Sequence, residues 1–119
     1  MHKRLLLIFR QPPFSNNRNR ETVDIALACA AFDIPVSLIF LSDAVLQLVK
    51  HQAAEVIEQK SLLKTLSALQ MYDVDDYYIL ESDLKRYQLS PGELTLPCKI
   101  LSAQQFAHLV RQFETVINL

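Results

Sequence analysis

The stretch LIFLSDAVLQLVKHQ, residues 38–52, decides the fold class of this chain. It opens on a run of apolar residues, which is typical of a strand buried on both faces of a sheet. Apolar residues at helical spacing follow at once, so the strand is expected to turn directly into a short helix. The joint between them is Ser42-Asp43 and contains no glycine. Open parallel sheets bind ligands where strands end and helices begin, so this joint is either a catalytic corner or a helix cap.

The same alternation of strand and helix continues on both sides of this stretch. A strand, a helix and a second strand within residues 4–41 form a unit of the length expected for two parallel strands with a crossover helix. Ser102 begins the last helix, and Gln105 three residues later predicts a capping box. The expected strands are residues 4–9, 36–41, 76–80, 98–101 and 115–119. We therefore expect one α/β domain over residues 1–119, a three-layer α/β/α sandwich with a five-stranded, mainly parallel sheet.

The bulk composition excludes several classes of protein. The chain has 119 residues, 50% of them hydrophobic, a mean hydropathy of +0.13 and a net charge of −1. Such a charge gives no reason to expect direct nucleic-acid binding. The apolar run at residues 5–9 is too short for a signal peptide, and no stretch approaches a membrane span. The two cysteines, without a signal peptide, indicate a reducing compartment, so a cytoplasmic protein is expected. The high apolar content predicts a sheet covered on both faces and a surface that meets a partner.

The residues that could carry catalysis form no complete site. Gly92 is the sole glycine and does not follow a strand, which argues against a phosphate-binding loop. Ser42 would need a general base to act as a nucleophile. Only His51 could supply one, if the chain folded back and placed His51 near Ser42. We favour the reading of Ser42-Asp43 as a helix cap. The three histidines are scattered along the chain, so we expect no metal, no cofactor and no catalytic residue.

The cysteines and tyrosines are the remaining candidates. Cys29 lies in the middle of a helix among apolar residues and is expected to be buried. Cys98 stands between a proline and a lysine, so it is the more accessible of the two, although a structural role is favoured for it as well. Four tyrosines cluster with aspartates around the third strand. They are compatible with edge-strand packing and with an interface core, and the sequence does not separate the two readings.

Several segments together resemble the TusC/DsrF family, within the DsrE-like superfamily of sulfur-relay proteins. They are Arg20-Glu21 with Asp24, the stretch IFLSDAVLQL at 39–48 with Gln52, and LQMYDVDDYYI at 69–79 leading into ESDL at 81–84. The resemblance spans essentially the whole chain and keeps the order of the elements. It rests on the joint spacing of these segments, since most of the matching positions are structural. It implies the same five-stranded α/β/α sandwich.

The resemblance also implies a function. TusB-, TusC- and TusD-like chains assemble into a heterohexamer that receives persulfide sulfur from TusA and passes it to TusE, for the 2-thiolation of wobble uridine in tRNA. The active cysteine of DsrE- and TusD-like chains lies near the end of the third strand. This chain has Tyr78 to Ser82 there, without a cysteine. The resemblance therefore implies a non-catalytic subunit, with TusB-like and TusD-like partners and no direct contact with nucleic acid or membrane.

Three alternatives stay open from the sequence. The chain could carry persulfide sulfur itself on Cys98, with Cys29 as a weaker candidate. It could be a DsrF-like subunit in sulfur oxidation. It could also be a small-molecule binder in the α/β crevice, for example a hydrolase that uses Ser42. Under the leading interpretation, we expect the subunit interface to include the following six residues: Ser42, Asp43, Gln47, Tyr72, Tyr77 and Tyr78.

Overall fold

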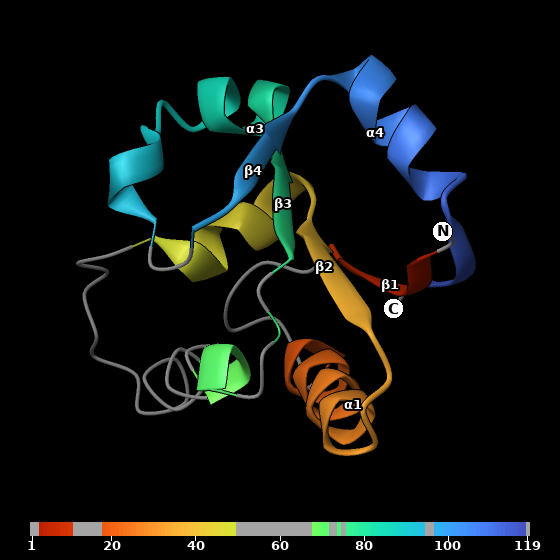
Figure 1. The fold of residues 1–119 in the computed structure, drawn as a ribbon. Coiled ribbons are helices and arrows are strands. Elements are labelled where there is room, and N and C mark those ends of the chain that lie inside the picture. Colours follow the sequence, from red (N-terminus) through yellow and green to blue (C-terminus); the bar gives the residue numbers. More distant parts are fainter. Residues whose placement is uncertain are drawn as a thin grey trace.

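The computed structural model confirms an α/β fold built on one five-stranded sheet (Figure 1). It describes residues 3–10, 18–49, 68–71, 74, 76–94 and 97–118. The strands are β1 (Lys3–Phe9), β2 (Val36–Phe40), β3 (Tyr77–Leu80), β4 (Lys99–Leu101) and β5 (Phe113–Asn118). The α-helices are α1 (Arg18–Ala31), α3 (Glu81–Arg86) and α4 (Ala103–Val110), and the 3₁₀ helices are η1 (Ser42–Leu48) and η2 (Pro91–Glu93). Residues 68–71 are also helical.

The sheet has the order β4-β3-β2-β1-β5, and every neighbouring pair is parallel. The expected mainly parallel sheet is thus confirmed, and no antiparallel pair occurs among these five strands. Parallel neighbours require a crossover between them, and α1 supplies it between β1 and β2. Since all strands point the same way, the residues that follow each strand gather at one edge of the sheet. We call this the carboxyl edge.

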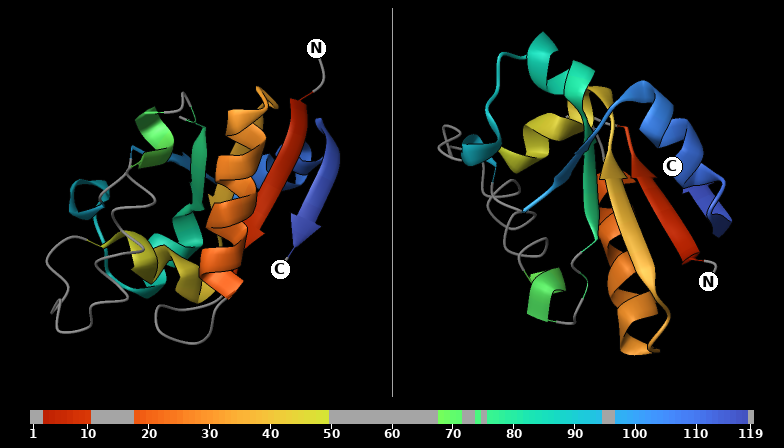
Figure 2. Two further views of the ribbon diagram at one scale, coloured as in Figure 1. Left: turned by 90° about the horizontal axis from the view of Figure 1, so that it is seen from below. Right: turned by 45° about the horizontal axis from the view of Figure 1, so that its top comes forward.

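Each face of the sheet is covered by its own apolar cluster, and the two clusters alternate along every central strand. Leu5, Leu7 and Phe9 of β1 face α1, while Leu6 and Ile8 face α4. Figure 2 shows α1 and α4 on opposite sides of the sheet. The period of two along each strand therefore fills two separate cores, as expected for a sheet that is buried on both faces.

The last helix follows its sequence signal closely. The Ser102 Oγ accepts a hydrogen bond from the Gln105 backbone N–H at 3.1 Å, and the Gln105 Oε1 accepts one from the Ser102 N–H at 2.8 Å. The predicted capping box is confirmed. Leu109 of α4 is buried against the sheet, so the helix is anchored at its start by hydrogen bonds and at its end by packing.

Candidate functional site

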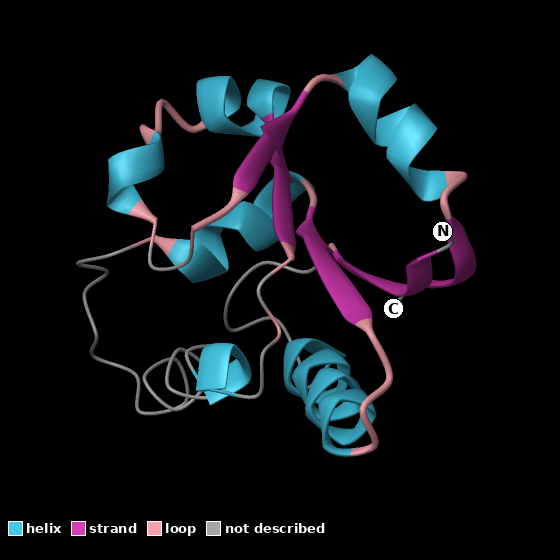
Figure 3. Ribbon diagram, viewed as in Figure 1, coloured by secondary structure: helices cyan, strands magenta, loops and turns pink. Residues whose placement is uncertain are grey.

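The polar residues that follow β2 and β3 meet at the carboxyl edge. Phe40 of β2 is paired with Ile79 of β3, so the two strands end side by side. β2 leads into η1 at Ser42, and β3 leads into α3 at Glu81 without any intervening loop (Figure 3). This edge is where a site in such a fold is expected.

Asp83 connects these two corners. Its carboxylate Oδ2 accepts a hydrogen bond of 2.8 Å from the backbone N–H of Ser42. The Asp83 side chain comes from the first turn of α3 and is 8% exposed. A charge-assisted bond of this kind is shorter and stronger than a neutral one. The β2 corner is therefore held by a residue that belongs to a different helix.

The predicted cap at Ser42-Asp43 is wrong. The N-cap position of η1 is Leu41, and it makes no side-chain capping bond. Ser42 itself has a φ of 52°, in the left-handed region that costs an L-residue about 1–2 kcal/mol. The backbone N–H of Ser42, the first residue of η1, instead donates to the Asp83 carboxylate, which comes from a different helix.

Asp43 makes a second link between the same elements. Its Oδ1 lies 3.7 Å from the Arg86 guanidinium of α3. Both side chains are largely exposed, so this ion pair contributes no more than about 1 kcal/mol. Whether Ser42 and Asp43 also contact a partner stays a prediction. The side chain of Gln47 and the whole of Tyr72 lie outside what the structure describes.

The other two tyrosines of the expected interface are buried. Tyr77 is 0% exposed on the α1 face and donates a hydrogen bond to the Val74 carbonyl. Tyr78 is 3% exposed on the opposite face, and the Lys99 ammonium lies 5.6 Å from its ring centroid. We therefore correct the expectation of an interface for these two residues, because the alternation of β3 places both rings in a core and leaves neither for a partner.

Neither cysteine has the surroundings of a reactive thiol. Burial raises the pKa of the Cys98 thiol to about 12, so this thiol is protonated at neutral pH. Cys29 is half-buried in α1 and packs against the same apolar cluster as Cys98. A persulfide carrier reacts through the thiolate, which burial disfavours. The geometry thus opposes the alternative in which Cys98 accepts sulfur.

The end of β3 offers a carboxylate and a hydroxyl and no sulfur. Glu81 and Ser82 are exposed, and the Glu81 Oε1 lies 2.8 Å from the Lys85 ammonium. The hydrogen bond from Lys85 holds the pKa of Glu81 below its ordinary value. Among the described residues, no group of three or more His, Cys, Asp and Glu side chains could hold a metal ion. None of the described helices is long and apolar enough to cross a membrane.

A groove of about 420 Å³ lies beside α4, and Ser42 is not among the residues that line it. Amide side chains, one imidazole and two leucines line it: Leu101, Gln104, Gln105, His108, Leu109 and Gln112. His51, the base that a Ser42 nucleophile would need, lies outside the described residues. The hydrolase alternative therefore gains no support from the part of the chain that the structure describes.

Sequence reasoning missed Asp83 as the residue that organises the carboxyl edge. The signal was present, because Asp83 follows β3 and Ser42 follows β2. When two parallel strands are neighbours in a sheet, the residues that follow them lie close together. The order of the strands, however, was needed to see that these two corners are adjacent.

Comparison with known proteins agrees with this architecture. The model of the DsrE/DsrF-like family matches residues 3–119. A Protein TusC homolog of Pseudomonas aeruginosa is 40% identical over 119 residues, covering 100% of both chains. A Protein TusC homolog of Haemophilus influenzae is 34% identical and covers 81% of this chain and 82% of its own. The crystal structure of the ychN protein from E. coli superposes with a TM-score of 0.77 at 16% identity, over 98% of this chain and 99% of that one, which shows the fold.

Proposed function

The chain belongs to the DsrE/DsrF-like family, and from that membership we propose that it is a non-catalytic subunit of a TusBCD-like sulfur-relay complex. In this proposal the complex receives persulfide sulfur from a TusA-like donor and passes it to a TusE-like acceptor, for 2-thiolation of tRNA wobble uridine. The full-length similarity to TusC homologs supports the choice of subunit.

One observation carries the proposal. The carboxyl end of β3, where the resemblance places the active cysteine of DsrE- and TusD-like chains, runs directly into Glu81 and Ser82. Sulfur transfer needs a thiolate that attacks the outer sulfur of the donor persulfide, so that a new S–S bond forms as the old one breaks and the donor leaves as a thiolate. A serine hydroxyl cannot replace the thiolate in this step, because it has no sulfur with which to form the new S–S bond. The attacking cysteine must then come from another subunit.

The geometry of this edge fits a supporting role. The Asp83–Ser42 bond and the Asp43–Arg86 ion pair connect the corner after β2 to the helix after β3, where the resemblance puts the reactive cysteine of a carrier chain. The Asp83 carboxylate would raise the pKa of a neighbouring thiol and would not activate it. This chain therefore supplies structure to the complex, and its partner supplies the sulfur chemistry.

The direct test is reconstitution with defined partners. The chain is co-expressed with the TusB-like and TusD-like chains of the same genome, and the purified complex is treated with a persulfide-loaded TusA-like protein. We expect native mass spectrometry to find all three chains together, and intact-mass analysis to find a one-sulfur gain on the TusD-like chain. A sulfur adduct on this chain, or no complex, would contradict the proposal.

A cysteine-free variant is the matched control in cells. Cys29→Ala with Cys98→Ala removes both sulfurs from the chain without placing a hydroxyl against the apolar cluster that both thiols contact. We expect this variant to restore the 2-thiouridine content of tRNA in a strain that lacks the gene. Restoration by the wild type alone would assign the sulfur to this chain, and unchanged tRNA in the deletion strain would favour a DsrF-like role in sulfur oxidation.

A further inference from the structure

The solvent-facing side of α1 changes character along its length. Glu21, Asp24, Ala28, Ala31 and Phe32 follow helical spacing, and all five are exposed. The first two are acidic and the last three are apolar. Residues 25–32, IALACAAF, contain no polar side chain at all. A helix that is apolar on every side is normally buried on every side.

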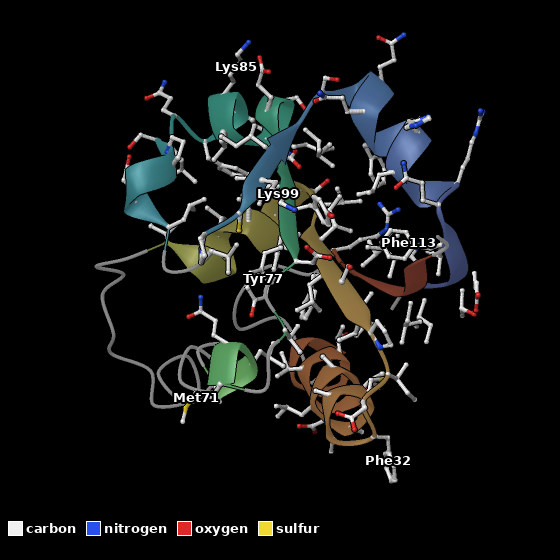
Figure 4. The ribbon with its side chains drawn as sticks, in the orientation of Figure 1. Phe32, Met71, Tyr77, Lys85, Lys99 and Phe113 are labelled. Atoms are coloured by element: carbon white, nitrogen blue, oxygen red, sulfur yellow. The ribbon has the colours of Figure 1, made fainter. Side chains whose placement is uncertain are left out.

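Only one side of this segment is used by the fold. Val23 and Ala26 are 0% exposed against the sheet, whereas Phe32 is 80% exposed and belongs to neither apolar cluster. Figure 4 shows Phe32 at the end of α1, pointing away from the ribbon. Ile34, two residues further, is 36% exposed. An aromatic side chain buries about 150–250 Å² when it is covered, so leaving it in water forgoes a large part of its stabilising effect.

We propose that the end of α1 together with the residue that follows it, from Ala28 to Phe32, is a docking surface for a different protein subunit. The surface of the other subunit that covers Phe32 is apolar at its centre and carries basic side chains at its rim. This inference rests on the proposed function, because it takes the partner to be another subunit of the relay complex. Aromatic side chains at the centre of an interface are the commonest energetic anchors.

Charge decides between a different subunit and a second copy of this chain. The exposed Asp24 and Asp33 bracket the apolar segment at its two ends. If two copies packed α1 against α1 in antiparallel fashion, Asp24 of one copy would lie beside Asp33 of the other. Parallel packing would bring each aspartate beside its own counterpart. Both arrangements oppose like charges, whereas lysines or arginines on a different chain would complement them.

The test uses the three-chain complex with single substitutions in this chain. Phe32→Ser removes the aromatic anchor, and Met71→Ser is the matched control, since Met71 is 85% exposed and lies on a different helical segment. We expect Phe32→Ser to raise the dissociation constant for the TusB-like or TusD-like partner at least about tenfold. Met71→Ser should change it less than about twofold. The melting temperature of the isolated chain should be the same in both variants, because neither side chain packs in the core.

A second substitution tests the charge argument. Asp33→Lys should slow association with the partner and weaken its dependence on salt, because it removes the attraction at the rim. If the wild type and Phe32→Ser assemble equally well, the docking surface is refuted while the proposed function stands. If the wild type forms homodimers that Phe32→Ser abolishes, the occupant is a second copy and the inference is wrong. Failure of the wild type to bind either partner would refute both proposals.

Discussion

At the scale of single residues, Cys98 shows how surroundings decide the chemistry of a thiol. It stands just before β4 and packs against the apolar cluster on the α1 face. Its pKa rises from an ordinary 9.0 to about 12, and burial is the cause. The same thiol in the unfolded chain is hydrated and ionises near its ordinary pKa. The folded state therefore keeps a proton that the unfolded state loses between these two values.

This difference predicts a dependence of stability on pH. The free energy of unfolding should keep the Cys98 contribution below pH 9 and lose it as the pH rises from about 9 towards 12. Between pH 7 and pH 10, the wild type should lose about 1 kcal/mol more than Cys98→Ala, which has no thiol to titrate. Urea unfolding of both chains at the two pH values measures this. Parallel pH profiles would mean that the Cys98 thiol is solvated in the folded chain.

At the scale of elements, the carboxyl edge depends on the contact between η1 and α3. Neither element is long: η1 is a 3₁₀ turn of 7 residues, and α3 has 6. Helical segments of this length are not stable alone. Each is held by its strand on one side and by the other element through Asp83. Loss of that carboxylate leaves the Ser42 N–H without its acceptor at a part-buried position.

Asp83→Ala should therefore lower the free energy of unfolding by about 1–3 kcal/mol, the cost of an unsatisfied buried donor. Asp43→Ala is the control, because it removes the neighbouring ion pair with Arg86, whose groups are exposed. It should cost less than about 1 kcal/mol. Chemical denaturation of the two variants measures both changes in the free energy of unfolding. Equal changes would show that the Asp83–Ser42 bond stabilises the fold no more than the exposed ion pair does.

The elements themselves were predictable from sequence where the signal is local. Apolar runs gave the strands to within two residues at each end, and Ser102 with Gln105 gave the start of α4. The Ser42 corner was not predictable in this way. Its backbone donor is satisfied by a residue 41 positions away, so a local capping rule could not find it. The fate of Tyr77 and Tyr78 likewise depends on what covers each face of β3, which is a property of the assembled sheet.

At the scale of the whole molecule, the sheet is strongest at its centre. β2 lies between β3 and β1, and both of its faces are covered, so its five residues are all buried. β4 is a three-residue strand at one edge, and Lys99 and Ile100 within it are exposed. The backbone hydrogen bonds of β2 are thus shielded from water on every side, whereas those of β4 are open on one.

Hydrogen exchange should reproduce this order. In the isolated chain, the amides of β2 and β1 should exchange slowest, at a rate set by global unfolding, and those of β4 should exchange fastest among the strands. Exchange followed by mass spectrometry of peptides resolves the strands. If the amides of β4 exchanged as slowly as those of β2, the outer strand β4 would open only when the whole domain unfolds.

The pairing of β1 with β5 has a consequence for how fast the chain folds. Leu5 is paired with Thr115, so the first strand described cannot find this neighbour until a loop on the order of a hundred residues has closed. Contacts between residues so distant in sequence slow the search for the native state. The β1–β2 pair, joined through α1 alone, can form first and serve as a nucleus, and β5 then adds to a sheet that already exists. Substitutions in β5 should accordingly speed unfolding more than they slow folding, as is general for interactions formed after the rate-limiting barrier.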